Sequence, residues 1–412
     1  MGIRRFFIVI CIFSLFQTIF AQKELNVQKE IKDAAKQYKT MLTTHQDVNK
    51  FPQSIWPDGE AKDMPSSWWC SGFFGGSLWY LYEFTHDTAW KNAATKWSMA
   101  VEKEKINTST HDLGFMLYCP FGNGYRLTKN GQYKQIMLTG AASLASRFNP
   151  KYGVIKSWDD WEGYDYPVII DNMMNLEFLF WAAKASGNKA YYDLCVTHAD
   201  NTLKNHFRKD YSSYHVICYG EGGKVLAQKT HQGAADSSAW SRGQGWALYG
   251  YTVMYRETKQ EKYLRQAEHV AHFILSHPNL PADKIPYWDF NAPHIPNEER
   301  DASAAAVMAS GLLELSQYSK TNSKLYIETA KTMLESLASP KYKAPIGSNK
   351  GFILMHSVGA KPKHSEIDVP LVYADYYYLE ALLRYDMISK KQNKSLAIKA
   401  NDALGLLAHA KK

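Results

Sequence analysis

The chain has 412 residues, of which 45% are hydrophobic and only 21% are charged. This balance excludes an intrinsically disordered protein and predicts a folded one with a large buried core. The formal net charge is +8, but no block of five or six consecutive Lys or Arg residues occurs, which argues against nucleic-acid binding. A mild positive excess spread along the chain suits an anionic substrate.

The first 21 residues have the pattern of a secretory signal peptide. Arg4 and Arg5 form a charged start, an apolar run follows over 6–20, and Ala21 precedes a polar residue. This run is shorter than the roughly 20 residues that a membrane-spanning helix needs. Cys11 lies inside the run without the small residues of a lipid-attachment signal. We therefore expect a protein exported to the periplasm, cleaved near Ala21, with no membrane anchor.

After this segment the chain repeats one pattern: an amphipathic stretch, a short polar turn, and a second stretch that opens on an aromatic ring. Apolar residues spaced by three and four, as in Leu176, Leu179 and Phe180, predict helices rather than strands. A sixth pair is expected over 373–385 and 395–410. Five clear repeats have turns at 85–87, 130–131, 186–188, 258–259 and 321–322, and rings at Trp90, Tyr133, Tyr191, Tyr263 and Tyr326.

Six helical hairpins can form an open solenoid or a closed toroid of inner and outer helices. The long connections rich in Gly, Pro and Trp all fall between hairpins, and the short turns all fall within them. The two kinds of connection therefore lie on opposite faces, which favours closure. We predict an all-α fold, an (α/α)6 barrel that forms one catalytic domain over 22–412. A first helix at 25–42 lies outside the ring or completes it.

Clusters of aromatic, acidic and amide residues lie just before, or at the start of, six apolar helical stretches. If these helices run in the same direction, the clusters meet at one end of the barrel. Aromatic residues make up 14% of the chain, and although most should fill the core, a wide aromatic and acidic cup would suit sugars. The clusters are Trp68-Trp69, His111-Asp112, Asp171-Asn172, Trp240-Ser241-Arg242-Gly243-Gln244, Arg300-Asp301 and Tyr373-Ala374-Asp375.

Two carboxylates in these clusters are candidate catalytic groups. Asp112 either caps the helix that follows it or serves in the site. Asp171 has apolar neighbours on both sides, and desolvation or a nearby carboxylate would raise its pKa. A carboxyl that is protonated near neutral pH can donate a proton. A helix N-terminus would instead lower that pKa, so the sequence leaves open whether Asp171 caps a helix or acts as an acid.

Polar candidates for substrate contact lie on the connection before Trp240 and just after it. His215, His231 and Gln232 belong to that connection. Arg242 could hold a carboxylate or sulfate through two parallel hydrogen bonds. It could equally pair with a barrel carboxylate such as Asp236. Rings that could stack on sugars are those of Trp68, Trp69, Trp158, Trp161, Trp240 and Trp246, of which Trp246, well inside its helix, is the best candidate for a core residue.

The cysteine and histidine spacings predict no metal centre. No CxxC pair and no convincing Cys/His or His/Asp metal spacing occurs. Disulfides are permitted in an exported protein, but a chain of this size does not require them. We expect buried free thiols at Cys70, Cys119, Cys195 and Cys218.

Seven segments, in order, resemble the unsaturated glucuronyl hydrolases of glycoside hydrolase family 88. The resemblance extends from about residue 50 to 387. It implies an (α/α)6 barrel without a metal or organic cofactor, acting on oligosaccharides that end in a 4,5-unsaturated uronic acid. The segments are Trp69-Cys70-Ser71-Gly72-Phe73-Phe74, His111-Asp112-Leu113-Gly114-Phe115, Ile170-Asp171-Asn172-Met173-Met174-Asn175, Thr230-His231-Gln232-Gly233, Trp240-Ser241-Arg242-Gly243-Gln244, Pro286-Tyr287-Trp288-Asp289-Phe290 and Arg300-Asp301-Ala302-Ser303-Ala304.

The resemblance also implies a mechanism. Asp171 protonates C4 of the unsaturated ring and then activates the water that attacks C5; the hemiketal opens and releases the next sugar. Asp112 orients ring hydroxyls and raises the pKa of Asp171. Because hydration needs no nucleophile at the anomeric carbon, the two carboxylates are not an inverting pair. The residues implied to line the subsites are His215, His231, Gln232, Arg242, Trp246, Trp69, Trp158 and His356.

Specificity and two alternative functions stay open. Met355 precedes His356 where an aromatic residue is expected, so the subsite for the leaving sugar is undefined. An unsaturated rhamnogalacturonyl hydrolase would share the barrel and the chemistry, whereas an exported non-catalytic glycan-binding protein would leave the acid at Asp171 unexplained. The expected partners are unsaturated uronic-acid oligosaccharides, sulfated or not, from glycosaminoglycans or from algal glucuronans such as ulvan. The sequence indicates no oligomeric state.

Overall fold

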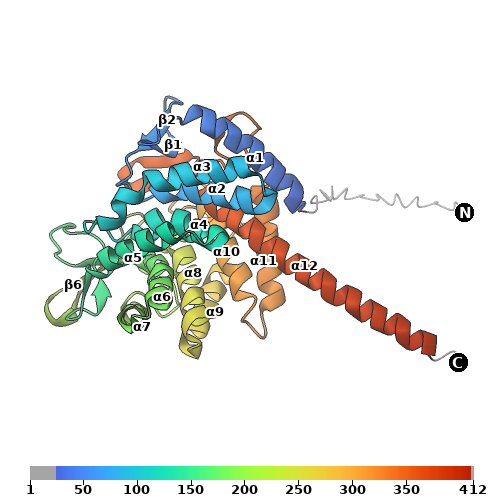
Figure 1. Cartoon of the computed structure of the whole chain (residues 1–412). Helices are drawn as coiled ribbons and strands as arrows, with labels where there is room; N and C mark the ends of the chain where they lie inside the picture. Colours follow the sequence, from blue (N-terminus) through green and yellow to red (C-terminus); the bar gives the residue numbers. More distant parts are fainter. Residues whose placement is uncertain (1–24, 410–412) are drawn as a thin grey trace, which may run out of the picture.

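The computed structural model describes residues 25–409, with side chains over 25–392. The predicted signal peptide at 1–21 lies outside the described residues. Two layers of helices surround a common axis (Figure 1). The inner layer consists of α2 (Ser71–Thr85), η2 with α4 (Gly114–Gly122 and Asn123–Thr128), η3 with α6 (Ile170–Asn175 and Leu176–Ser186), α8 (Ser241–Thr258), α10 (Ala302–Leu315) and α12 (Val372–His409).

The inner helices form a closed ring. Each contacts the next along the chain, and α12 returns to pack against α2. Every inner helix also has an outer helix packed against it. The predicted (α/α)6 barrel is therefore confirmed. The outer helices are α3 (Thr88–Ala100), α5 (Gly131–Ala145), α7 (Lys189–Asn205), α9 (Glu261–Ser276), α11 (Ser323–Leu337) and α1 (Val27–Thr44).

The short turns within hairpins have a common local cause. Four inner helices end on a residue in the left-handed region, which stops the helix and turns the chain toward the outer layer. These residues are His86, Lys129, Gly187 and Lys259. The outer helix that follows then begins on a side-chain cap in three cases, at Asp87, Asn130 and Asn188.

The sixth hairpin differs from the prediction. We expected a second helix over 395–410, but α12 is one continuous helix from Val372 to His409, and residue 410 lies outside the described residues. The outer partner of α12 is α1, which contacts both α12 and α2. The hydroxyl of Tyr378 donates to Glu30 Oε2 of α1 at 3.2 Å. The first helix thus completes the outer ring, which was one of the two expected arrangements.

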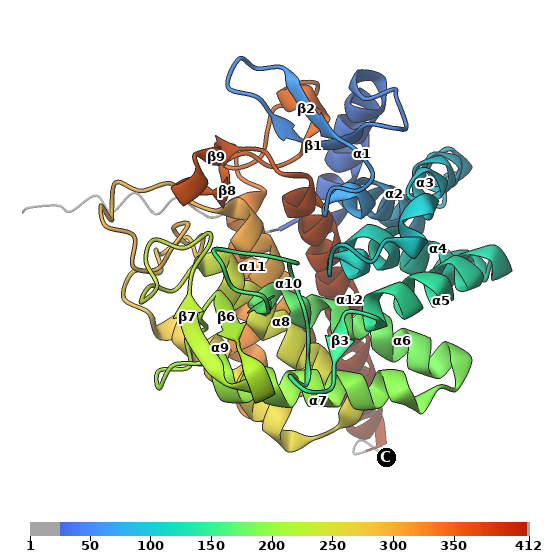
Figure 2. The same ribbon diagram turned by 90° about the vertical axis from the view of Figure 1, so that its left-hand side faces the viewer.

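The long connections carry short strands that the sequence analysis did not predict. They surround the barrel mouth on the face where the inner helices begin (Figure 2). All the ladders are antiparallel: β1–β2, β3–β4, β5–β6–β7 and β8–β9. The strands are β1 (Phe51–Ile55), β2 (Ala61–Met64), β3 (Phe148–Asn149), β4 (Val154–Ile155), β5 (Pro167–Ile169), β6 (Val216–Tyr219), β7 (Val225–Lys229), β8 (Ser357–Ala360) and β9 (Ser365–Val369), and the 3-10 turns outside the ring are η1 (Glu102–Ile106), η4 (Glu221–Gly223), η5 (Asn349–Gly351) and η6 (Lys361–Lys363).

One continuous apolar cluster joins the two helical layers. Close approach of the inner helices depends on small residues: a Cβ added at Gly250 of α8 would lie 2.5 Å from Met173 Cβ of η3. Four of the five repeat rings are buried between the layers; the ring of Tyr191 is half-buried. The free thiols expected at Cys70, Cys119, Cys195 and Cys218 are all present and buried.

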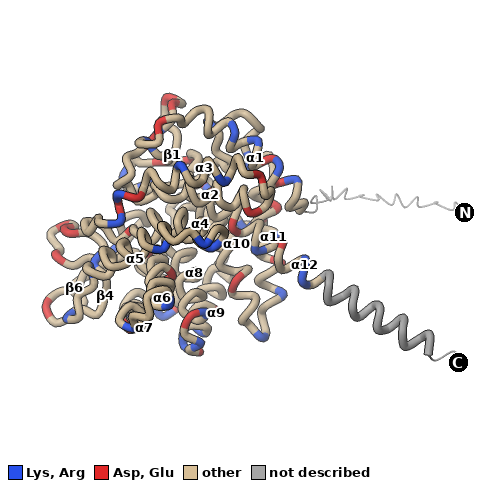
Figure 3. The backbone as a smooth tube through the Cα atoms, in the orientation of Figure 1, with Lys and Arg blue, Asp and Glu red and all other residues tan. Residues whose placement is uncertain are grey.

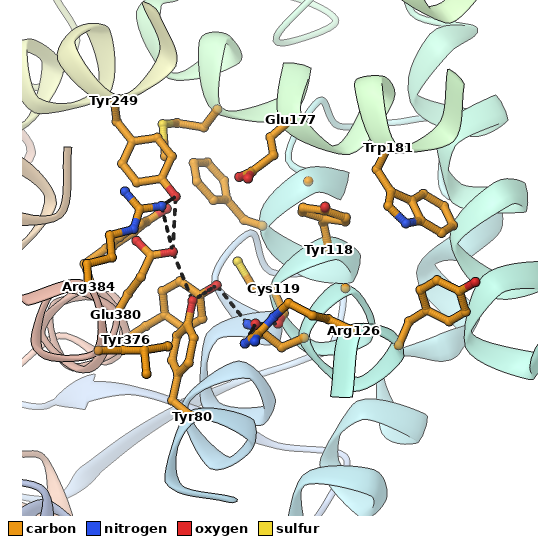
Figure 4. A pocket seen from close by; sticks show the side chains of 18 of the residues that line it. Tyr80, Tyr118, Cys119, Arg126, Glu177, Trp181, Tyr249, Tyr376, Glu380 and Arg384 are labelled. Carbon is orange, nitrogen blue, oxygen red and sulfur yellow. Dashed lines mark hydrogen bonds and ion pairs between the residues drawn. The ribbon is translucent and has the colours of Figure 1, made fainter. Parts of the chain in front are cut away.

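A cavity of about 480 Å³ occupies the barrel interior toward the short-turn end (Figure 4). Its polar lining is bonded to itself: Tyr80 donates to Glu380 at 3.0 Å, and Arg384 donates to the hydroxyl of Tyr249 at 2.8 Å. Most charges there are paired, Arg126 with Glu83, Arg384 with Glu380 and Glu314, and Glu177 with Arg256. Because these groups bond to one another, the network stabilises the closed ring.

Charged residues of both signs are interspersed over the helices and loops (Figure 3). In that view the Lys and Arg residues of the described part of the chain are not gathered on one face. Among the described residues, no helix combines the length and the hydrophobicity that a bilayer crossing requires.

Candidate active site

A cavity of about 300 Å³ opens at the face where the inner helices begin. Five of the six predicted clusters contribute to its wall, and Asp301 of the sixth bonds to Arg242 from behind. The clusters therefore meet at one end of the barrel, as predicted. Its lining comprises Trp68, Trp69, His111, Asp112, Trp158, Ile169, Asp171, His231, Gln232, Arg242, Gly359, Ala360, Lys363, Ser365, Glu366 and Tyr373.

Asp171 lines this cavity. It is the second residue of η3, which follows β5 directly, and the pairing of β5 with β6 continues through a bond from Ile170 N to His215 O (3.0 Å). Its carboxyl caps no helix, and Oδ2 is buried without a hydrogen-bond partner among the described residues. Burial raises the pKa of Asp171 to about 7; Arg242 opposes the rise and Asp112 adds to it. Desolvation is the largest cause of this shift, and of the two alternatives left by the sequence the helix cap is absent.

Asp112 lines the same cavity as Asp171. Its Oδ2 accepts a hydrogen bond from Thr110 Oγ1 at 2.7 Å, and its Oδ1 lies 3.4 Å from His111 Nε2. No backbone N–H of η2 donates to this carboxylate, so Asp112 is not a helix cap. Its negative charge is one of the causes that raise the pKa of Asp171. Of the two interpretations of Asp112, the structure favours a place in the site.

His215 is buried directly behind the wall, next to Asp171. Its Nδ1 accepts hydrogen bonds from the backbone N–H groups of His231 (3.1 Å) and Gln232 (3.2 Å). Burial lowers the pKa of His215 well below its usual value, so the ring is neutral and carries its proton on Nε2. That nitrogen lies 3.6 Å from Asp171 Oδ2. The ring also stacks on Trp240, with centroids 4.4 Å apart.

The connection between β7 and α8 supplies one side of the cavity. His231 Nδ1 accepts from the indole of Trp161 at 3.2 Å, and its ring lies 5.2 Å from that of Trp158. Gln232 donates from Nε2 to the carbonyl of Gly359 at 2.8 Å, which ties this connection to β8. His231, Gln232 and Trp158 all line the cavity, as predicted.

Arg242 lines the cavity, but its guanidinium is already occupied. Nη1 donates to Asp301 Oδ2 (2.9 Å) and to the carbonyl of Val358 (2.6 Å), and Nη2 donates to the carbonyl of Gly359 (2.9 Å). The side chain is 1% exposed, and only Nε lacks a partner among the described residues. The structure therefore does not support the predicted pair of parallel hydrogen bonds from Arg242 to a substrate anion. The alternative, a barrel carboxylate, is correct in kind, but the partner is Asp301 rather than Asp236.

Aromatic rings also line the cavity. The ring of Trp69 lies 4.8 Å from that of Tyr373 and 5.5 Å from that of Phe115. Trp246, predicted both as a subsite residue and as the best core candidate, is fully buried against Phe115 and does not line the cavity. Its indole N–H favours the anion of Asp171 but makes no hydrogen bond of ordinary length.

His356 is not brought into this cavity. It lines a neighbouring depression of about 370 Å³, where its Nδ1 lies 2.7 Å from Asp368 Oδ1. The predicted position in the leaving-sugar subsite is therefore not supported by the geometry. The reason is local: β8 begins one residue after His356, and the ring lies beside Tyr342 instead.

The hairpin of β8 and β9 contributes wall residues that the sequence analysis missed. Lys363, Ser365 and Glu366 line the cavity from this hairpin. Glu366 accepts from Lys62 at 2.9 Å and bonds to Gln53, so β2 and β1 hold it. The only signal was that the connection at 339–370 lies on the same face as the six clusters. Without a predicted strand, no register pointed to particular residues.

Over residues 25–392, no group of three His, Cys, Asp or Glu side chains is arranged to hold a metal ion. The geometry instead offers one protonated carboxyl, a second carboxylate, two neutral histidines and a ring of aromatic side chains. Such a set can transfer a proton within a sugar-binding pocket.

Comparison with known proteins gives the family. Residues 31–386 match Glycosyl Hydrolase Family 88, a span that covers most of the chain. The chain belongs to glycoside hydrolase family 88.

Relatives within family 88 agree. An unsaturated glucuronyl hydrolase of Formosa agariphila is 45% identical over 367 residues, 88% of this chain and 91% of that protein. An unsaturated chondroitin disaccharide hydrolase of Streptococcus pneumoniae is 30% identical over 377 residues, 89% of this chain and 94% of that protein. The crystal structure of an unsaturated glucuronyl hydrolase specific for heparin has a TM-score of 0.86 and 49% identity, covering 88% of this chain and 98% of that one.

The resemblance inferred from the seven segments is confirmed. This family 88 chain is an enzyme, a glycoside hydrolase of the unsaturated glucuronyl type. Neither the rhamnogalacturonyl hydrolase nor the non-catalytic binding protein is favoured by these relatives.

Proposed function

We propose that this family 88 enzyme removes 4,5-unsaturated glucuronic acid from the non-reducing end of oligosaccharides produced by polysaccharide lyases. The observation that carries the proposal is the carboxyl of Asp171. It is buried in the lining of an aromatic cavity, its Oδ2 has no protein partner among the described residues, and burial raises its pKa to about 7. A carboxyl with these properties is about half protonated at pH 7, more fully protonated below it, and free to act on a substrate.

In the proposed reaction, Asp171 gives its proton to C4 of the unsaturated ring, and positive charge develops at C5 and the ring oxygen. Water then adds at C5 and returns a proton to the Asp171 carboxylate. The product is a hemiketal, which opens to a keto sugar and breaks the link to the next sugar. Asp171 is thus acid and then base, and no residue attacks the anomeric carbon.

Asp112 is the second catalytic residue of the proposal. Its carboxylate lies in the same cavity and raises the pKa of Asp171. A carboxylate in that place accepts hydrogen bonds from ring hydroxyls, which orients the sugar toward Asp171. We assign sugar contacts to Trp69, Trp158, His231 and Gln232, because all four line the cavity.

We infer glycosaminoglycan fragments as the substrates. Two of the relatives described above are specific for such fragments by name, one for chondroitin disaccharide and one for heparin. The cavity wall carries Lys363, which forms no ion pair among the described residues and could attract a sulfate or carboxylate, and Glu366, an acid held by Lys62. A panel of lyase products, sulfated and unsulfated and including ulvan fragments, tests this inference by comparing kcat/KM among them.

The decisive experiment follows the ultraviolet absorbance of the unsaturated uronate. Incubation of a lyase-generated disaccharide with the enzyme should remove that absorbance, whereas a binding protein would leave it intact. Asp171→Asn should reduce the rate by at least about a thousandfold while circular dichroism stays unchanged. An active Asp171→Asn variant would remove Asp171 from the mechanism.

We also propose that the protein is exported to the periplasm. Two arginines followed by an apolar run over 6–20 support this proposal. Mass spectrometry of the protein recovered from a periplasmic extract should give a mature chain that starts close to residue 22. A cytoplasmic protein that retains Met1 would contradict export.

A further inference from the structure

A chain of buried polar groups ends on Asp112, and the function proposed above assigns it no part. It runs from the backbone of β4 through Asn172 and Asn175 to His111. All three side chains are fully buried, each with 0% exposure. Burying three polar side chains in an apolar barrel costs free energy unless each is bonded. Packing alone therefore does not account for this series of buried polar side chains.

The backbone fixes which atom donates at each step. Gly114 N–H can only donate, and it bonds to Asn175 Oδ1 at 2.9 Å, so Asn175 Nδ2 is the donor on the other side. That nitrogen donates to Asn172 Oδ1 at 2.9 Å and lies 3.3 Å from His111 Nδ1. Asn172 Nδ2 in turn donates to the carbonyl of Ile155 at 2.8 Å. The backbone N–H of Gly114 lies at one end of this series of hydrogen bonds, and the carbonyl of Ile155 lies at the other.

His111 therefore accepts at Nδ1. Burial lowers the pKa of His111, so the ring is neutral, and a neutral ring with an acceptor at Nδ1 carries its proton on Nε2. Nε2 lies 3.4 Å from Asp112 Oδ1, outside hydrogen-bonding geometry, and makes no hydrogen bond among the described residues. A donor in that place favours the ionised form of the carboxyl. The other charged groups that act on the pair are Asp171, in the same cavity, and Arg147.

We propose that His111 is a positioning residue: the chain of Asn172, Asn175 and His111 aims one N–H at Asp112, and this donor orients the carboxylate and favours its anionic form. This inference rests on the proposed function, in which Asp171 is the acid. It also explains a glycine, because a Cβ at Gly114 would collide with Asn175 Oδ1. Gly114 follows His111 by three positions in the sequence, and Asn175 follows Asn172 by three.

Two amide substitutions separate positioning from packing. The amide nitrogen of His111→Gln reaches the level of Nε2 and keeps a donor near Asp112, whereas that of His111→Asn ends at the level of Nδ1 and does not. The measurement is the pH profile of kcat/KM in the absorbance assay, whose acidic limb reports any group that must be ionised for activity. With His111→Asn we expect the acidic limb to move up by about one pH unit and kcat/KM to fall about tenfold or more. With His111→Gln we expect both to stay close to wild type.

A matched control comes from His198, another buried histidine. It is 0% exposed, its Nδ1 accepts from Ile155 N at 3.1 Å, and it touches neither carboxylate of the cavity. His198→Asn should lower the melting temperature without moving the acidic limb. An unmoved limb in His111→Asn, or an equal movement in His198→Asn, overturns the proposal.

A variant that fails to fold does not end the test. If His111→Asn is unfolded, Asn175→Ser takes its place, since the hydroxyl can still accept from Gly114 N while the donor to His111 is lost. The acidic limb should then move in the same direction, by about half a pH unit, and an unmoved limb refutes the inference. Failure of the proposed function is distinct, because in that case Asp171→Asn keeps its activity.

Discussion

His215 Nε2 lies 3.6 Å from Asp171 Oδ2. Because two backbone N–H groups donate to Nδ1 of His215, its ring proton is on Nε2. The histidine therefore presents a donor, not an acceptor, to the carboxyl that we propose as the acid. At this distance the two atoms are not hydrogen-bonded, but the N–H can close to hydrogen-bond distance when Asp171 becomes a carboxylate after protonating the substrate. The N–H of His215 therefore stabilises the carboxylate that Asp171 becomes after it has given its proton to the substrate.

This relationship predicts the effect of removing the donor. His215→Leu should lower kcat/KM by about 10- to 100-fold, the loss expected when a charged acceptor loses one hydrogen bond of about 1.5–3 kcal/mol. His215→Gln, whose amide N–H can reach the position of Nε2, should recover part of the loss. Steady-state kinetics with the lyase-generated disaccharide gives both values. Equal activity in His215→Leu and wild type would show that this N–H has no part in the reaction.

The pKa of Asp171 predicts the basic side of the pH profile. Because the acid must be protonated and its pKa is about 7, kcat/KM should halve near pH 7 and fall tenfold for each further pH unit. Removing the negative charge of Asp112 lowers the pKa of Asp171. The residual activity of Asp112→Asn should therefore lose its basic limb at lower pH than wild type. A basic limb that moves up instead would contradict the assigned coupling.

The same raised pKa predicts a stability effect. As pH rises above about 4, the unfolded chain releases the Asp171 proton while the folded chain keeps it until about pH 7, so this carboxyl progressively destabilises the fold over that window. Asp171→Asn does not titrate. The variant should gain about 2–4 kcal/mol relative to wild type between pH 4.5 and pH 8. Chemical denaturation at the two pH values measures the change, and a constant difference would refute it.

The barrel and most of its mouth could be predicted because they follow from local patterns. Helical spacing, polar turns and repeated clusters fix which helix ends share a face, and seven of the ten candidate site residues line the cavity. The pKa of Asp171 could not be predicted. Its value depends on desolvation by residues distant in sequence, which outweighs Arg242.

The remaining differences have physical causes that sequence patterns do not carry. The hairpin of β8 and β9 is too short and too polar to show strand alternation, so Lys363 and Glu366 were missed and His356 was misplaced. The partner of Arg242 was also hidden, because Asp301 is 59 positions away. Long-range pairing of this kind needs the closed ring. The continuous α12 and its pairing with α1 depend on the same closure.

The position of His356 predicts a small effect. Its ring lies beside Asp368 and outside the cavity, so His356→Ala should leave KM for the disaccharide within about twofold. Trp158→Ala provides the comparison, because that indole lines the cavity beside His231. Loss of a stacking ring should raise KM about tenfold. A tenfold rise for His356→Ala would place that histidine in the leaving-sugar subsite after all.

The buried pair of Arg242 and Asp301 gives a last prediction. Removing one member of a buried ion pair leaves an uncompensated charge and costs about 3–5 kcal/mol. Arg242→Met should therefore lower the free energy of unfolding by roughly 3 kcal/mol, and it should also raise KM, because the carbonyls of Val358 and Gly359 lose their donor and the β8 hairpin loosens. The double variant Arg242→Met with Asp301→Asn should recover about 1–3 kcal/mol relative to the sum of the single variants.

Chemical denaturation and steady-state kinetics on the same four proteins separate two roles of Arg242. A structural role couples the loss of stability to the rise in KM, and Asp301→Asn alone should then raise KM too, because it weakens the hold on the guanidinium. A direct grip on a substrate anion would raise KM in Arg242→Met while stability stayed near that of wild type. Because only Nε is unpaired among the described residues, we expect the coupled outcome.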